Sequence, residues 1–199
     1  MGARTQWWPL RPDRSDDVIN AQQENARMLA SLIGVREDEA AERLDRTVLI
    51  TSALDEKSQS WALEIRALIE RTVNVAIDPA VKATVELVVG DAEGRGTVPR
   101  IYASIDRQKA VVNTAPVTVS SSSPHGLFAG IAACSVAAAA LSKAIDTKGG
   151  PAATLPLVLR LSDLGITAGA LEAPINVDDA VLIGAGAVGH GFLRALRHV

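Results

Sequence analysis

The apolar positions of the first third of the chain recur at helical spacing and then gather in a compact run. Residues 16–33 and 37–44 predict two helices. The β-branched run at residues 47–51 predicts a buried strand, and residues 55–72 and 73–77 predict a helix and a second strand. A strand, a helix and a strand at this spacing indicate a parallel crossover, the repeating unit of α/β proteins.

The middle of the chain alternates over shorter distances, as expected for a series of strands. Strands are predicted at residues 81–89, 101–105 and 110–113, with a further short one at 117–119. The glycine-rich stretch 90–96 predicts a flexible loop. We therefore expect an α/β fold, a Rossmann-like parallel or mixed sheet that is flanked by helices.

A long alanine-rich helix is predicted to follow, with Ser123 as its N-cap and its end near Ile145. Its larger apolar residues fall at alternating steps of four and three: Leu127, Ile131, Cys134, Ala138, Leu141 and Ile145. Small residues between them allow close packing all round, so we expect a central core helix in which Cys134 is buried. The stretch 127–141 is too short and too weakly apolar to predict a membrane span.

Composition excludes several classes of protein. The net charge is −3 and the sequence pI about 5.6, which argues against nucleic-acid binding. The single cysteine excludes an intrachain disulfide and a multi-cysteine zinc site, and it fits a cytoplasmic location. The N-terminus lacks the apolar core of a secretory signal.

Pro156 restricts residues 155–161 to an edge strand.

The strongest chemical signal lies in the last twenty residues, where an apolar run enters a Gly-x-Gly-x-x-Gly turn and a helical pattern leaves it. Gly184 permits the tight bend, Gly186 lets the backbone approach a pyrophosphate, and Gly189 lets the helix lie close to the strand. The N–H groups at the start of that helix would bind the phosphates. An acidic residue that holds the ribose is expected roughly 20 residues after the glycines. Only residues 190–199 follow, so we expect this nucleotide site to need a later segment or a partner.

Other polar residues are explained without catalysis. His125 near the start of the alanine-rich helix predicts a surface or capping residue, and Asp55 predicts a helix N-cap. Residues 52–55 stand where the first strand–helix unit would carry a phosphate loop, and an acid there would repel a phosphate. His190 and His198 have no metal ligand at a suitable spacing. We therefore predict no catalytic residue and no metal site.

The order of these features resembles the ThiF/HesA/MoeB superfamily of E1-like, ubiquitin-activating enzymes. The resemblance covers residues 47–199 and includes the entry into the alanine-rich helix at residues 123–134 and the glycine turn. It implies that Gly184, Gly186 and Gly189 hold the phosphates of ATP. It also implies a non-catalytic or truncated part of a protein that adenylates the C-terminus of a ubiquitin-like or sulfur-carrier protein, acting as a homo-oligomer or with a missing partner half.

Two alternatives use the same glycines. The chain is then a fragment of an NAD(P)- or FAD-binding oxidoreductase, or a structural α/β module in which the turn no longer binds a ligand. We predict a division into an N-terminal arm with helices (1–46), a degenerate Rossmann-like domain (47–172) and the start of a second nucleotide-binding unit (173–199). No nucleic-acid or membrane partner is expected.

Overall fold

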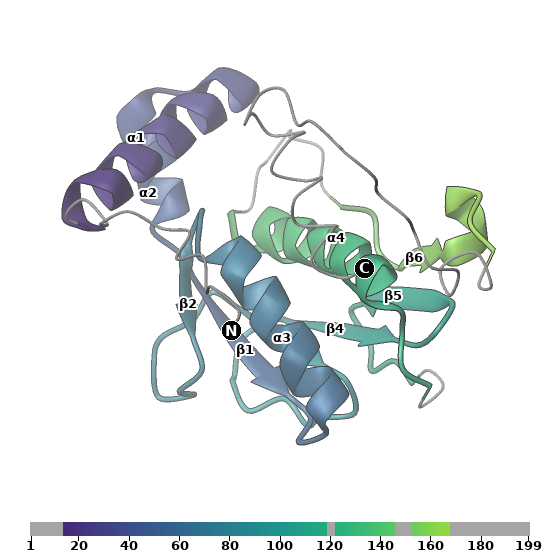
Figure 1. Cartoon of the computed structure of the whole chain (residues 1–199). Coiled ribbons are helices and arrows are strands. Elements are labelled where there is room, and N and C mark those ends of the chain that lie inside the picture. The colour runs from purple at the N-terminus through teal and green to yellow at the C-terminus, as the bar shows by residue number, and fades with distance from the viewer. Residues whose placement is uncertain (1–13, 119–121, 146–152, 168–199) are drawn as a thin grey trace, which may run out of the picture.

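The computed structural model describes residues 14–118, 122–145 and 153–167, which form a mixed six-stranded sheet with helices against it (Figure 1). The strand order is β2-β1-β3-β4-β5-β6. The strands are β1 (Thr47–Ser52), β2 (Asn74–Ala76), β3 (Val85–Val89), β4 (Arg100–Ile105), β5 (Lys109–Asn113) and β6 (Leu157–Arg160). Strands β1 to β4 are parallel, whereas β5 and β6 add antiparallel ladders, so the predicted α/β fold with a mixed sheet is confirmed.

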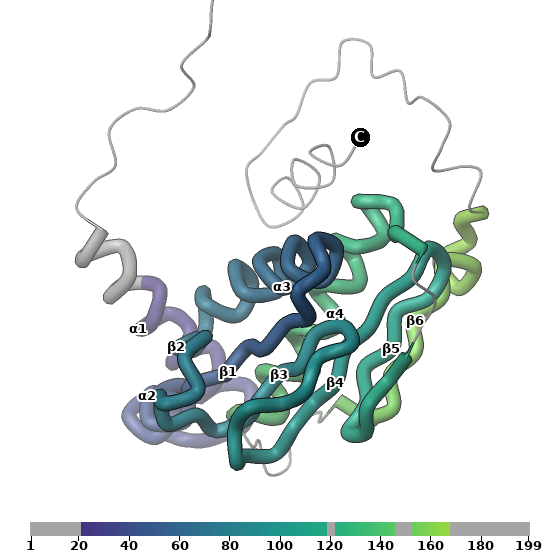
Figure 2. Tube along the Cα trace, turned by 90° about the horizontal axis from the view of Figure 1, so that it is seen from below, coloured from purple at the N-terminus to yellow at the C-terminus, as the bar shows by residue number. Residues whose placement is uncertain are grey.

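Four α-helices and one 3-10 helix are described: α1 (Arg14–Ile33), α2 (Glu37–Leu44), α3 (Glu56–Ile69), α4 (Gly126–Ile145) and η1 (Leu161–Leu164). Helices α3 and α4 pack against each other and lie on the same face of the sheet (Figures 1 and 2). Helix α1 packs on α2 and ends at Ile33, and the next residue, Gly34, has a φ of 70° that is readily adopted only by glycine.

The core lies between the sheet and helices α3 and α4. Along β3, Val85, Leu87 and Val89 belong to this core, and the period-2 alternation of a strand turns Glu86 and Val88 to the opposite face. Trp61, Ile65 and Ile69 are buried on the inner face of α3, and Leu68 is partly buried against the same core. Hydrophobic burial between sheet and helices therefore fixes their relative position.

The prediction for α4 is wrong about which side is buried. The face against the sheet consists of other, mostly smaller residues: Phe128, Ala132, Ala133, Val136, Ala137, Ala139, Ala140 and Ala144. Cys134 is exposed, as is Ala138, and the remaining members of the predicted stripe are only partly buried. Small side chains let the helix approach the strands closely. A helix that is apolar on all sides carries no periodic signal for its buried face.

Helix α4 has the length and hydropathy of a membrane-crossing helix, the one such helix in the described part of the chain. The sequence-based objection to a span, that the apolar stretch is too short and too weakly apolar, is therefore wrong. The helix packs against β1, β3, β4 and β5, as the core helix of a sheet-based domain does. Its apolar character is thus explained in part by packing within the domain.

The remaining segments differ from expectation in small ways. Strand β3 begins only at Val85, and Val117 and Thr118 form no strand. Strand β6 does lie at the edge of the sheet, directly after a cis Leu155–Pro156 bond. Asp163 accepts a hydrogen bond from the Arg160 backbone N–H at 3.2 Å. This N–H of the edge strand is therefore not available to pair with a further strand. The division at 172/173 lies outside the described residues, and the proposed division of the chain stays a prediction.

Candidate functional site: the crevice at the end of β1 and β3

The topology defines one place where an α/β sheet usually binds a ligand. The chain runs from β1 through α3 to β2 on one side, whereas β3 lies on the other side of β1. This reversal of strand order opens a crevice outside the carboxyl ends of the strands. A cavity of about 860 Å³ lies there, lined by the starts of α3 and α4 and by residues that follow β1 and β3.

Asp55 occupies the N-terminus of α3 at this crevice. Its carboxylate accepts the Ser58 backbone N–H at 2.9 Å, which confirms the predicted N-cap. Hydrogen bonds from the Ser58 backbone and hydroxyl group hold the pKa of Asp55 below its usual value, with a smaller contribution from Lys57. An ionised carboxylate therefore sits where the N–H groups of a helix would otherwise bind phosphate.

Close backbone packing narrows the crevice further. Gly90, the first residue after β3, has a φ of 76°, and a Cβ built on it would lie 2.2 Å from Ser58 Oγ. The Ala53 N–H donates to Val89 O at 2.9 Å, and the Gly90 N–H donates to Ala103 O at 2.8 Å. The loops that follow β1 and β3 are thus tied to the neighbouring strands and to α3.

The charge of the cavity lining is also unfavourable for a nucleotide. Four carboxylates line it, from Asp55, Glu56, Glu64 and Asp91. One basic residue, Lys57, lines it as well, and its Nζ donates to Ile105 O at 3.3 Å. Negative charges that line the same cavity repel the phosphates of ATP or NAD. Among the described residues, no group of His, Cys, Asp and Glu could hold a metal ion.

A buried carboxylate on the opposite face of the sheet escaped the sequence analysis. Glu86, the second residue of β3, is fully buried, and its Oε1 accepts from Thr51 Oγ1 at 2.8 Å and from the Arg95 N–H at 2.6 Å. Its Oε2 accepts from the Gly96 N–H at 3.0 Å and from Arg100 Nε at 2.9 Å. Burial raises the pKa of Glu86, but these four hydrogen bonds together hold it below its usual value.

The hydrogen bonds of Glu86 hold a loop that joins two parallel strands without a crossover helix. Parallel strands are usually joined by a helix, but β3 and β4 are joined by the loop 90–99. Glu86 fixes this loop through the backbone of Arg95 and Gly96, and the Arg100 guanidinium donates back to Gly96 O at 2.6 Å. The available signal was a single acid inside an apolar strand, followed by glycines and an arginine.

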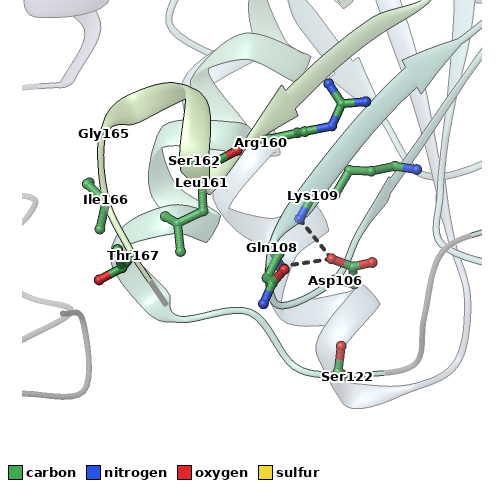
Figure 3. A pocket seen from close by; sticks show the side chains of 10 residues that line it. All are labelled: Asp106, Gln108, Lys109, Ser122, Arg160, Leu161, Ser162, Gly165, Ile166 and Thr167. Atoms are coloured by element: carbon green, nitrogen blue, oxygen red, sulfur yellow. Dashed lines mark hydrogen bonds between the residues drawn. The ribbon is translucent and has the colours of Figure 1, made fainter. Parts of the chain in front are cut away.

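A second cavity, of about 750 Å³, lies at the far side of the sheet between β5, β6 and η1 (Figure 3). Asp106 turns the β4–β5 hairpin by accepting the backbone N–H groups of Gln108 and Lys109, both at 2.8 Å. Lys109 and Arg160 are paired in register, and their side chains run in the same direction. Thr167, where the described part ends, also lines this cavity.

The other predicted residues are placed as follows. His125 is a capping residue: its Nδ1 accepts the Leu127 N–H at 3.2 Å, and α4 begins at Gly126, so Ser123 is not the N-cap. Cys134 is exposed on α4, not buried. Gly184, Gly186 and Gly189 of the predicted phosphate turn lie outside the described residues, as do both histidines of the C-terminal stretch.

Comparison with known families identifies the class of protein that this fold represents. The family described as the E1 N-terminal domain matches residues 18–167, which includes the whole sheet with α3 and α4. The chain therefore belongs to the E1 N-terminal domain family. No curated protein matches the chain.

Proposed function

We propose that this chain forms part of an E1-like protein that uses ATP to adenylate the C-terminus of a ubiquitin-like or sulfur-carrier protein. The described domain is the non-catalytic part, and Gly184, Gly186 and Gly189 hold the nucleotide phosphates. The expected setting is a cytoplasmic homo-oligomer or a complex with a further adenylating unit. Membership of the E1 N-terminal domain family supports the E1-like part of this proposal.

The acidic N-cap of α3 at the β1/β3 crevice is the observation that supports assigning the phosphates to the glycine turn and not to the described domain. Asp55 takes the N-terminus of α3, and Gly90 packs against Ser58 where a phosphate loop would need room. A phosphate placed there would meet an ionised carboxylate in place of free N–H groups. The glycine turn at residues 184–189 has the opposite character, because it carries no acid.

Calorimetric titration of the full-length gene product with ATP and with NAD tests the proposal. We expect ATP binding that Gly186→Val abolishes, because the new side chain would stand between the backbone and the phosphates. Ala187→Val adds similar bulk at a position between the glycines and is the matched control, which should retain most of the affinity. Asp55→Asn should leave the affinity for ATP unchanged.

The chemistry is tested by ATP–pyrophosphate exchange in the presence of a ubiquitin-like or sulfur-carrier protein encoded in the same organism. Exchange that depends on the carrier's C-terminus supports the proposal. Preferential binding of NAD would instead assign the glycine turn to an oxidoreductase. Equal behaviour of Gly186→Val and the wild type in every assay would make the turn a structural remnant.

A further inference from the structure

Two positively charged side chains lie directly opposite each other at one end of the β5–β6 ladder. Lys109 of β5 and Arg160 of β6 are register partners in this antiparallel pair. Residues that stand opposite in such a ladder point to the same face, with their Cβ atoms roughly 5 Å apart. The two side chains run in the same direction (Figure 3). Like charges at this position repel each other, so the pair lowers the stability of the domain on its own.

The acidic residues of the two adjacent turns do not neutralise this pair. The Asp106 carboxylate accepts the backbone N–H groups of Gln108 and Lys109, both at 2.8 Å. The Asp163 carboxylate accepts the Arg160 backbone N–H at 3.2 Å. In the part of the chain that the structure describes, neither the Lys109 ammonium nor the Arg160 guanidinium forms an ion pair.

The pair lies on the face of the sheet away from α3 and α4. Ala110 and Val112 of β5 belong to the core beneath these helices, so the alternation of the strand turns Lys109 to the other face. Neither α3 nor α4 therefore covers the pair (Figures 1 and 2). Arg160 is exposed and Lys109 is half-buried. A partner molecule can thus approach both charges from this face.

We propose that Lys109 and Arg160 bind an acidic segment of a partner protein. A carboxylate between the two side chains would offset their mutual repulsion and be attracted by both charges. The planar Arg160 guanidinium can hold a carboxylate through two parallel hydrogen bonds, and the Lys109 ammonium adds a second positive charge beside it. The hydrogen bonds to Asp106 and Asp163 fix the backbone of both residues in advance, which lowers the entropy lost on binding.

A nucleic acid fits this surface less well than an acidic protein segment does. The many phosphates of a nucleic acid interact with the charge of the whole chain, which is −3. Four carboxylates also line the β1/β3 crevice, on the other half of the same sheet. A short acidic segment needs to meet only the two cations. The partner inferred here is therefore a protein with a local run of acidic residues.

Fluorescence anisotropy of rhodamine-labelled hexaglutamate, titrated with the 199-residue chain, measures this binding directly. In about 50 mM salt, where screening is weak, we expect saturable binding with a Kd below about 1 mM. Hexaglutamine, which has the same length without charge, should bind at least about tenfold more weakly. Absence of saturable hexaglutamate binding by the wild-type chain would overturn the proposal, and this result needs no variant to fold.

A pair of neutral substitutions tests whether the binding depends on these two residues. Lys109→Gln/Arg160→Gln should weaken hexaglutamate binding at least about tenfold. The matched control is Arg71→Gln/Lys82→Gln, which removes the same charge from two exposed residues that flank β2, at the opposite edge of the sheet. The control should retain the affinity of the wild type. Equal loss in both double variants would show general charge attraction and overturn the proposal.

A single charge reversal separates binding from a purely structural role. Lys109→Glu places opposite charges in register, so it should raise the melting temperature by about 2 °C while hexaglutamate binding is lost. A melting temperature that does not rise would show that the two charges do not repel each other, which would overturn the proposal.

Titration with an oligothymidylate tests the competing class of ligand. Tighter binding of the oligonucleotide than of hexaglutamate would assign the surface to nucleic acid and overturn the proposal. Weaker binding of the oligonucleotide supports it. These assays contain no ATP, so their outcome does not depend on the adenylation proposed above.

Discussion

Arg100 of β4 lies in register with Glu86 of β3, and its Nε donates to Glu86 Oε2 at 2.9 Å. The carboxylate is fully buried, whereas the arginine side chain is 36% exposed. The pair is stable inside the fold because Glu86 also accepts two backbone N–H groups and the Thr51 hydroxyl. Burial of a charge is tolerated only when its hydrogen-bonding capacity is used in this way.

Glu86→Leu should lower the free energy of unfolding by about 3 kcal/mol, because it leaves the N–H groups of Arg95 and Gly96 without their acceptor. Urea denaturation followed by circular dichroism measures the change. The matched control is Glu93→Leu, an exposed acid in the same loop, which should stay within about 0.5 kcal/mol of the wild type. Similar losses for both variants would show that the cluster does not hold the loop.

The contribution of Glu86 should depend on pH in a defined direction. Its pKa in the folded protein lies below the usual 4.5, so the folded state favours the ionised form. The stability it provides is therefore complete above pH 4.5 and is lost as the pH falls through the lower folded pKa. The difference in unfolding free energy between the wild type and Glu86→Gln should be constant near neutral pH and shrink under acid conditions. A difference that grows with acidification would contradict this assignment.

Gly90→Ala should destabilise the protein more than Gly34→Ala. Both glycines have a positive φ, 76° and 70°, so alanine meets the same backbone penalty of about 1 kcal/mol at each. A Cβ at Gly34 would meet nothing within 4 Å, whereas one at Gly90 would lie 2.2 Å from Ser58 Oγ. Thermal unfolding of both variants isolates the steric part, which Ser58→Ala should partly relieve. Equal melting temperatures of the two variants would mean that Ser58 offers no steric obstacle to a side chain at position 90.

Asp55→Ala should cost about 1 kcal/mol, because it removes the N-cap of α3. Asp91→Ala is the matched control: Asp91 lines the same cavity but is exposed and caps no helix. Differential scanning fluorimetry of the two variants separates loss of the cap from loss of one negative charge in the cavity. A larger effect of Asp91→Ala would show that the charge of the lining outweighs the cap.

The fold was predictable from the sequence to a large extent because its signals are local. Residues 37–44 form the predicted helix with the same bounds, and Asp55 caps α3 as its side chain type suggests. The hairpin turn at Asp106 follows from the same local chemistry, a carboxylate that accepts nearby backbone N–H groups. These features depend on neighbours only a few residues away in the chain.

The features that escaped prediction depend on long-range packing. The buried side of α4 is set by the strands beneath it, and alanine-rich sequence offers no contrast between faces. Glu86 is satisfied by Thr51, Arg95, Gly96 and Arg100, which the fold brings together from three segments. Nothing in the alternation of the β3 region shows that these partners converge on one carboxylate.

Hydrogen–deuterium exchange of the full-length gene product, with and without ATP, tests most directly where the nucleotide binds. The account predicts that ATP slows exchange in peptides covering residues 184–191 and leaves those covering residues 53–60 and 90–92 unchanged. Protection at the N-terminus of α3 and at Gly90, with none at the glycine turn, would contradict it.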